Sequence, residues 1–318
     1  MKYLTIVFLF FCAALLRAGE APLRGTLTIF HAGSLAVPIK DMTTAFKKLH
    51  PGLEIRCESA GSRECARKIS DLDRPCDVFA SADYAVIDQL LIPKHASWNI
   101  RFASNEMAIV YREKSRRAGE ITAANWAEIL LDPQVAFGRA DPNTDPCGYR
   151  AVLTMKLEEK RLGQAGLAAK LLAKDVNYIR PKEVDLLAQL ASGSIDYIFL
   201  YRSVAHQHGL KYVILPDEVN LKNPALTALY GSVSATISGK TPGSTIEQKG
   251  EPMVYGVTIP AKAENPAAAL AFVRFLLTAD QGLSILEKQG QPSVVPAPST
   301  RFTAIPEALK TFAKSSEK

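Results

Sequence analysis

Cysteine and histidine are scarce in this sequence, with five residues of each among 318. No Cys-x-x-Cys pair occurs, and the only two histidines that lie close together, His206 and His208, have no cysteine beside them. This pattern argues against a structural zinc site. The Gly-x-Ser-x-Gly motif of a nucleophile elbow and the Gly-x-Gly-x-x-Gly motif of a dinucleotide-binding turn are also absent. Neither of these enzyme classes is therefore indicated.

Dense basic runs and long apolar runs are missing beyond the N-terminal segment. Lysine and arginine are spread along the chain without interleaved aromatic residues, which argues against a nucleic-acid partner. No later segment approaches the roughly 18 uninterrupted apolar residues of a membrane helix. The formal net charge is +6, and a mild positive field would help an anionic ligand arrive.

The N-terminus has the pattern of a secretory signal peptide. A basic second residue precedes an apolar run over 3–16, which is too short to span a bilayer as a helix, and small residues follow at Ala18 and Ala21. Residues 1–21 are therefore predicted to be a signal peptide, and the mature chain to be periplasmic. A lipid anchor on Cys12 is not expected, because two bulky phenylalanines precede it.

Short apolar strands alternate with helical patterns in the first part of the chain. Apolar runs at 27–30, 53–59 and 76–83 each precede a stretch with apolar residues at helical spacing. This alternation predicts βαβ units and a parallel sheet. Two longer extended segments, 102–115 and 253–260, are placed to carry the chain into a second domain and back.

We therefore expect an α/β protein of two domains, joined by two crossing strands, with a ligand cleft between them. The predicted boundaries are 22–106 for the first part of domain 1, 107–252 for domain 2, and 253–318 for the return to domain 1. The polar segment 238–252 is rich in glycine and proline and is expected to be a surface loop, whereas 265–290 is expected to be helical.

Two loops share one pattern, a strand followed by Gly-Ser and then a helix. They are Gly33-Ser34 in HAGSL and Gly61-Ser62 in AGSRE. Open α/β sheets bind ligands outside the carboxyl ends of their strands, where helix N-termini present free N–H groups. Both loops would lie on the same edge of one sheet, where they could cradle an anion. The alternative, that both serines are ordinary N-caps, remains open.

A further helix begins at Asp145-Pro146-Cys147. Asp145 suits the N-cap and Pro146 the first helical position, but N–H groups here could also face the cleft. A carboxylate would repel an anion unless the ligand has an electrophilic centre that accepts another oxygen. Glu183, at a helix start, and Tyr201, at a strand end, likewise have structural explanations in the helix dipole and in packing.

Several motifs in the same order resemble the tungstate/molybdate-binding proteins of ABC importers, especially their archaeal type. The motifs are FHAGSL, AGSRECARKI, ASADY, DPCGYR, KEVDLL and YRSVAHQHGLKY, and the resemblance runs from about residue 27 to beyond residue 290, where GQPSVVPA also fits. It implies a type II periplasmic-binding-protein fold that closes around an oxyanion, with no catalytic activity. A membrane permease would be the partner. We expect a monomer with no cofactor beyond its ligand, tungstate or molybdate.

The resemblance also implies ligand contacts. The matching positions are Gly33, Ser34, Ser62, Asp145, Pro146, Cys147, Glu183 and Tyr201. In this family two carboxylates approach the metal itself, which Asp145 and Glu183 would match. Tungsten(VI) and molybdenum(VI) can expand their tetrahedral coordination to an octahedral one, whereas sulfur in sulfate does not readily do so. The carboxylates would therefore favour the metal oxyanions and repel sulfate.

Cysteine pairing is left open by these motifs. Four cysteines follow the predicted signal peptide: Cys57, Cys65, Cys76 and Cys147. An even number in an oxidising compartment permits two disulfides in any of three connectivities. Cys57 and Cys76 lie outside the shared motifs, and a disulfide between them is a hypothesis.

Two other functions remain open from the sequence. One is a receptor of the same fold for a plain tetrahedral anion such as sulfate or phosphate. The other is a secreted hydrolase that uses Asp145 and Glu183 as an acid–base pair, although no cluster of sugar-stacking aromatic residues accompanies them. Tungstate and molybdate cannot be ranked, because the two ions are nearly equal in size and charge.

Overall fold

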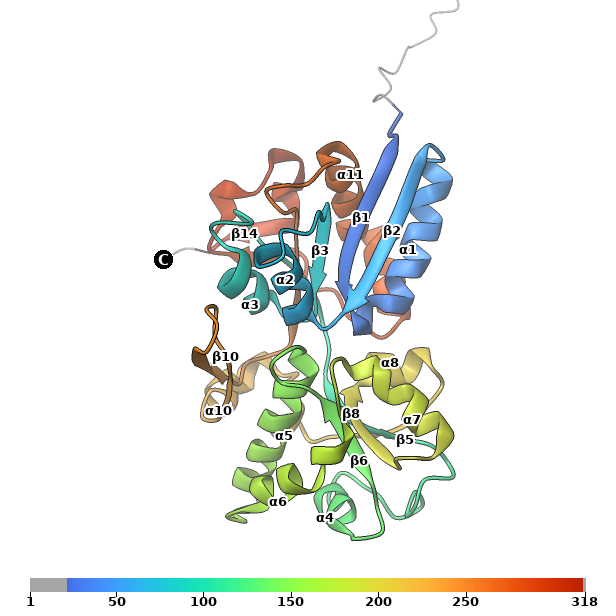
Figure 1. The fold of residues 1–318 in the computed structure, drawn as a ribbon, viewed down its shortest axis with the longest axis vertical. Helices are drawn as coiled ribbons and strands as arrows, with labels where there is room; N and C mark the ends of the chain where they lie inside the picture. The colour runs from blue at the N-terminus through green and yellow to red at the C-terminus, as the bar shows by residue number, and fades with distance from the viewer. Residues whose placement is uncertain (1–21, 317–318) are drawn as a thin grey trace, which may run out of the picture.

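The chain forms two lobes, each built around a five-stranded sheet and arranged one above the other along the long axis (Figure 1). The computed structural model describes residues 22–316. The predicted signal peptide lies outside the described residues. Lobe 1, at the top of Figure 1, has the strand order β2-β1-β3-β12-β4, and lobe 2 has the order β7-β6-β8-β5-β9.

Lobe 1 contains the predicted βαβ units. Its strands are β1 (Gly25–Ala32), β2 (Leu53–Ala60), β3 (Val78–Ser81), β4 (Ile100–Ser104) and β12 (Val254–Thr258), with β13 (Ala297–Ser299) and β14 (Ala313–Ser315) as a separate pair. Its α-helices are α1 (Ala36–Leu49), α2 (Ser62–Ser70), α3 (Tyr84–Val86), α11 (Pro266–Leu277) and α12 (Ser284–Lys288). β1 pairs in parallel with β2 and β3, which confirms the predicted parallel sheet, and β12 runs antiparallel to β3 and β4.

Lobe 2 is the middle of the chain. Its strands are β5 (Met107–Tyr111), β6 (Phe137–Ala140), β7 (Ile179–Arg180), β8 (Tyr197–Tyr201) and β9 (Lys211–Ile214). Its α-helices are α4 (Trp126–Leu131), α5 (Pro146–Leu162), α6 (Leu167–Lys174), α7 (Leu186–Ser192), α8 (Arg202–Gln207), α9 (Asp217–Asn220) and α10 (Thr227–Tyr230). All five residues of β8 are buried, as expected for an apolar strand that is covered on both faces of its sheet.

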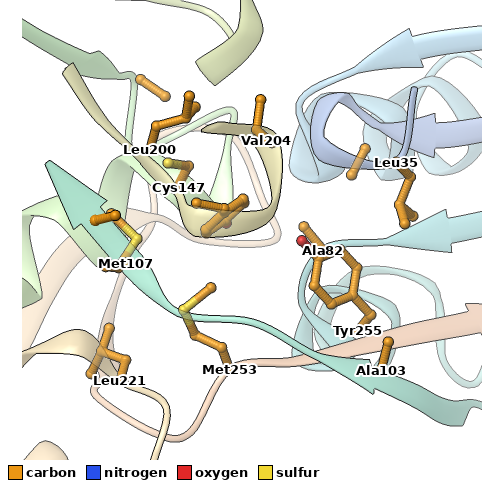
Figure 2. Packing of buried hydrophobic residues seen from close by; sticks show 14 of the residues in the cluster. Leu35, Ala82, Ala103, Met107, Cys147, Leu200, Val204, Leu221, Met253 and Tyr255 are labelled. Atoms are coloured by element: carbon orange, nitrogen blue, oxygen red, sulfur yellow. The ribbon is translucent and has the colours of Figure 1, made fainter. Parts of the chain in front are cut away.

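Two segments of the chain connect the lobes. The first runs from β4 through Asn105 and Glu106 into β5, so the single extended segment expected here is divided between the two sheets. The second leads from Met253 into β12. Figure 2 shows buried side chains gathered on both sides of this connection, with Cys147 on the side of lobe 2 and Tyr255 on the side of lobe 1.

One expectation about secondary structure is wrong. The segment 238–252 is not wholly a surface loop, because β11 (Thr245–Lys249) pairs antiparallel with β10 (Ser234–Ser238). Gly239, Pro242 and Gly243 lie in the turn between these strands, and Gly250 and Pro252 follow β11. The segment 265–290 is helical, as expected, but α11 and the helix that follows it are bent by 59°. Gly282 approaches the α11 backbone so closely there that a Cβ would lie 2.4 Å from the Cα of Leu276.

The four cysteines in residues 22–316 are free thiols, so the disulfides that their even number permits are not formed. Only Cys57 is exposed, and the other three are packed in the interior. Burial raises the pKa of Cys65 to about 12 and also raises the pKa of Cys76. Within the described part of the chain, no single helix is long and apolar enough to cross a membrane.

Candidate functional site

The candidate site lies where the two Gly-Ser loops of lobe 1 face lobe 2. β1 and β2 pair with Ala32 opposite Ala60, so the loops after them begin side by side at one edge of the sheet. The first loop forms a 3-10 turn, Gly33–Leu35 (η1), and the second leads into α2. Ser34 and Ser62 stand inside these helices rather than at their N-caps. The simple N-cap explanation for both serines is therefore wrong.

Asp145 is both a helix cap and a member of the site. It is the N-cap of α5, where its Oδ1 accepts a hydrogen bond from the N–H of Cys147 at 2.7 Å and Pro146 takes the first turn. Its Oδ2 accepts a second hydrogen bond from the N–H of Glu183 at 3.0 Å. Glu183 opens the 3-10 turn Glu183–Asp185 (η4). One aspartate therefore joins the starts of two helical segments and brings the two predicted carboxylates together.

Glu183 is 1 % exposed, yet neither carboxylate oxygen has a hydrogen-bond partner of acceptable geometry within residues 22–316. The side chain faces the first Gly-Ser loop across the boundary between the lobes. A Cβ atom on Gly33 would lie 2.7 Å from Oε2 and 2.9 Å from Oε1. Glycine at position 33 thus leaves the room that this carboxylate occupies. An unsatisfied polar group in such a place costs about 1–3 kcal/mol, and more when it is charged.

Burial raises the pKa of Glu183 well above its ordinary value, and the negative charge of Asp145 raises it further. Burial also raises the pKa of Asp145, although hydrogen bonds and the positive charge of Arg150 act in the opposite direction. An electron-poor centre next to both carboxylates would stabilise their charged forms. Residues 22–316 contain no group of three or more His, Cys, Asp or Glu that could hold a metal ion. A metal centre at this pair would therefore have to arrive with oxygen atoms of its own.

The three predicted hydroxyl contacts, Ser34, Ser62 and Tyr201, are fully buried. Their oxygens accept hydrogen bonds of 3.0, 2.9 and 2.9 Å from the Tyr255 hydroxyl, the Ala82 N–H and the Arg150 Nη1, respectively. The protein thus holds each hydroxyl oxygen in place with a donor.

Arg150 is a member of this region that the sequence reasoning missed. From α5 in lobe 2, its guanidinium donates to the carbonyl of Ala82 at 2.7 Å and lies 3.3 Å from Oδ2 of Asp83, both in lobe 1. The neighbouring Tyr149 hydroxyl also donates to Asp83. Both residues belong to the motif DPCGYR, in which the aspartate and the proline drew the prediction. A charged residue among the otherwise uncharged residues 146–155 of α5 was the available signal.

Cys147 occupies its predicted place, but its backbone N–H is already bonded to Asp145. Its thiol is buried and lies 3.7 Å from the carbonyl oxygen of Phe199. Burial raises the pKa of this thiol well above its ordinary value, and the charge of Asp145 adds to the effect. The thiol of Cys147 is therefore neutral, and its backbone N–H belongs to the cap of α5.

The lobes contact each other directly beside the site. The N–H groups of Arg63 and Glu64, at the start of α2, both donate to the carbonyl of Thr144, at 3.1 and 3.2 Å. Gly61 approaches the same carbonyl so closely that a Cβ would lie 2.3 Å from the oxygen. The structure is therefore closed at this point, and two N–H groups expected to face an anion instead join the lobes.

The carboxyl of Glu251, just before β12, predicts a pH dependence of stability. Burial and the negative charge of Asp83 raise the pKa of Glu251, and the positive charges of Arg150 and Arg101 lower it. The resulting pKa is about 7. The Tyr84 hydroxyl donates to this carboxyl at 2.7 Å. Between its ordinary value of 4.5 and about 7, the folded protein binds this proton more tightly than the unfolded chain does. The free energy of unfolding should therefore fall as pH rises through this window.

The test is the variant Glu251→Gln, which has no proton to lose at this position. Its melting temperature relative to the wild type should rise between pH 5 and pH 8. A constant difference over this range would contradict the assignment. The exposed Glu307, which pairs only with Lys310 on the surface, provides the control variant Glu307→Gln.

Comparisons with known proteins agree with this architecture. A family model described as bacterial extracellular solute-binding protein matches residues 27–291. An uncharacterized solute-binding protein of Petrotoga mobilis is 45% identical over 314 residues, covering 98% of this chain and 97% of the relative. The molybdate/tungstate-binding protein WtpA of Thermococcus kodakarensis is 39% identical over 313 residues, covering 90% and 86%.

The fold also matches a solved structure, the periplasmic molybdate-binding protein of Azotobacter vinelandii. The TM-score is 0.63 at 17% identity, with 85% of this chain and 99% of that chain covered. At this identity the match concerns the fold alone. It agrees with the type II architecture of two α/β lobes joined by crossing segments.

Proposed function

The chain belongs to the family of bacterial extracellular solute-binding proteins, and from this premise we propose that it is the receptor of an ABC importer for molybdate or tungstate. The ligand lies between the lobes, against Gly33, Ser34 and Ser62 from lobe 1. Asp145, Pro146, Cys147, Glu183 and Tyr201 form the wall from lobe 2. Support for the ligand class comes from relatives named as molybdate/tungstate-binding proteins, at 39% and 37% identity.

The observation that carries the proposal is the unpartnered carboxylate of Glu183 beside Asp145. Each carboxylate supplies one oxygen to the tungsten or molybdenum of the bound oxyanion. These two oxygens and the oxygens of the oxyanion itself complete an octahedral arrangement around the metal. This bond satisfies the buried charge that the protein leaves without a donor. Sulfate or phosphate cannot accept it, because the central sulfur or phosphorus keeps its tetrahedral shell, and the carboxylates then repel the anion.

The domain boundaries and the cellular setting follow from the same proposal. We assign 22–106 and 253–318 to domain 1 and 107–252 to domain 2, so that the crossings at residues 104–107 and 253–254 act as the hinge. The closed form binds ligand better than the open form does, and the ligand therefore shifts the population toward closure. The protein works as a monomer outside the cytoplasmic membrane, after loss of residues 1–21, and delivers its ligand to the permease.

Titration calorimetry with sodium tungstate, molybdate, sulfate and phosphate tests the proposal. We expect tungstate and molybdate to bind, and sulfate and phosphate to bind at least about 100-fold more weakly, which corresponds to about 2.8 kcal/mol. A ligand present at 100 times its dissociation constant should also stabilise the fold by about 2.7 kcal/mol. Tight sulfate binding without tungstate binding would refute the proposal. Turnover of glycosides would instead favour a hydrolase.

A further inference from the structure

The hydroxyl groups of Ser34, Ser62 and Tyr201 play the same role in their hydrogen bonds with the protein. Each oxygen accepts a hydrogen bond from the protein. No hydrogen bond in residues 22–316 uses any of the three hydroxyl protons as donor. A hydroxyl has one proton to give, and a buried proton without an acceptor costs free energy. All three protons are therefore available to oxygen atoms of a ligand.

A series of consecutive hydrogen bonds gives the Ser34 hydroxyl this acceptor role. The Oδ1 of Asn105 accepts from the N–H of Glu106 at 2.9 Å, which fixes the orientation of the amide. Its Nδ2 then donates to the Tyr255 hydroxyl oxygen at 2.8 Å. The Tyr255 hydroxyl keeps one proton to give, and it donates this proton to the Oγ of Ser34 at 3.0 Å. The backbone N–H at the start thus fixes the orientation of the Asn105 amide, and this amide supplies the donor that the Tyr255 oxygen accepts.

The residues of this hydrogen-bond series lie in or next to the two segments that connect the lobes. Asn105 lies between β4 and β5, and Tyr255 lies in β12. Asn105 also donates to the hydroxyl of Ser203 in α8 at 2.7 Å, so the same amide contacts lobe 2. In addition, Gln291 donates to the backbone carbonyl of Ser34 at 3.1 Å. The serine hydroxyl is thus held by Tyr255 of β12, next to the connecting segments, rather than from its own loop, and Figure 2 shows Tyr255 on the side of lobe 1.

We propose that Asn105 and Tyr255 are positioning residues that fix the Ser34 hydroxyl as a hydrogen-bond donor to the bound oxyanion. The ligand oxygen at this position must accept a hydrogen bond. This inference rests on the proposed function, because it assigns the orientation of one ligand contact in that site. Tyr255 acts through Ser34 and does not itself touch the ligand.

The test is a double-mutant cycle measured by titration with sodium tungstate. Tyr255→Phe removes the donor to Ser34 and should weaken binding about 10-fold, the order of one hydrogen bond. Ser34→Ala should weaken it at least as much. Tyr255→Phe in the Ser34→Ala background should cause no further loss, because the hydroxyl through which it acts is gone. If a variant binds too weakly to titrate, the tungstate-induced shift in melting temperature provides the same comparison.

Two controls separate positioning from packing. In the Ser62→Ala background, the loss from Tyr255→Phe should persist in full, because Ser62 is held by the Ala82 N–H instead. Tyr230→Phe removes another buried tyrosine hydroxyl, which donates to the carbonyl of Asp217 at 2.5 Å in lobe 2. That variant should lose stability and keep its tungstate affinity.

The Asn105→Asp variant tests the first side chain of the hydrogen-bond series from Asn105 through Tyr255 to Ser34, called the relay below. The substitution keeps the shape of the side chain and replaces the amide donor by an acceptor, so the Tyr255 hydroxyl turns away from Ser34. Its cost in affinity should shrink in the Ser34→Ala background. Two results together would overturn the relay. Asn105→Asp would weaken tungstate binding as much in the Ser34→Ala background as in the wild type, and the losses in affinity from Tyr255→Phe and Ser34→Ala would multiply in the double variant.

These outcomes are distinct from a failure of the proposed function. If the wild type binds another oxyanion of the panel instead of tungstate, the cycle is measured with that ion, and the relay is judged by the same coupling. If the wild type binds none of the four oxyanions, both proposals fall.

Discussion

Replacing Glu183 by glutamine is expected to weaken tungstate binding by about 100-fold or more, on the scale of 2–5 kcal/mol for a buried charged contact. The same variant should melt at a higher temperature than the wild type when no ligand is present. At neutral pH, folding must either bury the charge of Glu183 beside that of Asp145 or bind a proton, and glutamine avoids both costs. Titration calorimetry and thermal unfolding at pH 7.5 measure the two effects.

Opposite signs for affinity and stability are the signature of a residue kept for binding at the expense of the fold. Asp185→Asn is the matched control, since this carboxylate lies on the same 3-10 turn, is partly exposed and forms an ion pair with Lys182 at 3.6 Å. It should change neither quantity much. If Glu183→Gln binds tungstate as the wild type does, the carboxylate is not a ligand.

Asp145→Asn should behave like Glu183→Gln toward tungstate. Asparagine still offers an oxygen to the N–H of Cys147 and remains a good N-cap, so α5 should keep its start, although its NH2 group cannot accept the hydrogen bond from the Glu183 N–H. A loss of affinity without a loss of helix would separate the role in binding from the role in capping. Unchanged affinity would leave Asp145 as a cap and nothing more.

Replacing Gly61 by alanine is expected to reduce tungstate affinity by roughly 10- to 100-fold, because overpacking a tight contact costs about 1–3 kcal/mol. The new Cβ would lie 2.3 Å from the backbone oxygen of Thr144 and 3.2 Å from the Cα of Asp145. This clash exists only where lobe 1 meets lobe 2. The substitution therefore acts against closure and leaves the interior of each lobe intact.

Small-angle scattering separates this mechanism from loss of a ligand contact. With saturating tungstate the wild type should become more compact, whereas Gly61→Ala should need far more ligand to reach the same radius of gyration. Gly119→Ala is the control, because its Cβ would meet nothing within 4 Å. Normal closure and normal affinity of Gly61→Ala would show that the contact with Thr144 does not limit binding.

Prediction from the sequence succeeded where the signal was local. The two Gly-Ser loops follow parallel strands, whose carboxyl ends necessarily share an edge, and the register of Ala32 with Ala60 bears this out. Asp145 followed by Pro146 marks a helix start in any context, and the structure has it there. The hairpin of β10 and β11 was missed because its glycine and proline content outweighed the short alternation of buried and exposed residues in each strand.

Long-range partners were out of reach of that reasoning. Tyr255 and Ser34 are 221 residues apart in the chain, and Arg150 is 68 residues from Ala82. A tyrosine in a buried strand and an arginine in a helix have no spacing that names such partners. The direction of the hydrogen bond between Tyr255 and Ser34 is still harder to predict from the sequence, because it depends on the orientation of the Asn105 amide, which a backbone N–H sets.

The sequence by itself determined the alternation of strands and helices, the two loops at one sheet edge and the cap at Asp145, because each depends on neighbours within a few positions. The tertiary structure alone decided that, within residues 22–316, the buried Glu183 carboxylate has no hydrogen-bond partner of acceptable geometry beside Gly33 and the Ser34 hydroxyl accepts from Tyr255 without donating, and that Gly61 leaves room for the carbonyl of Thr144. Each of these depends on atoms from both lobes, or from the segments between them, meeting at distances of a few ångströms, and only the folded chain brings them together.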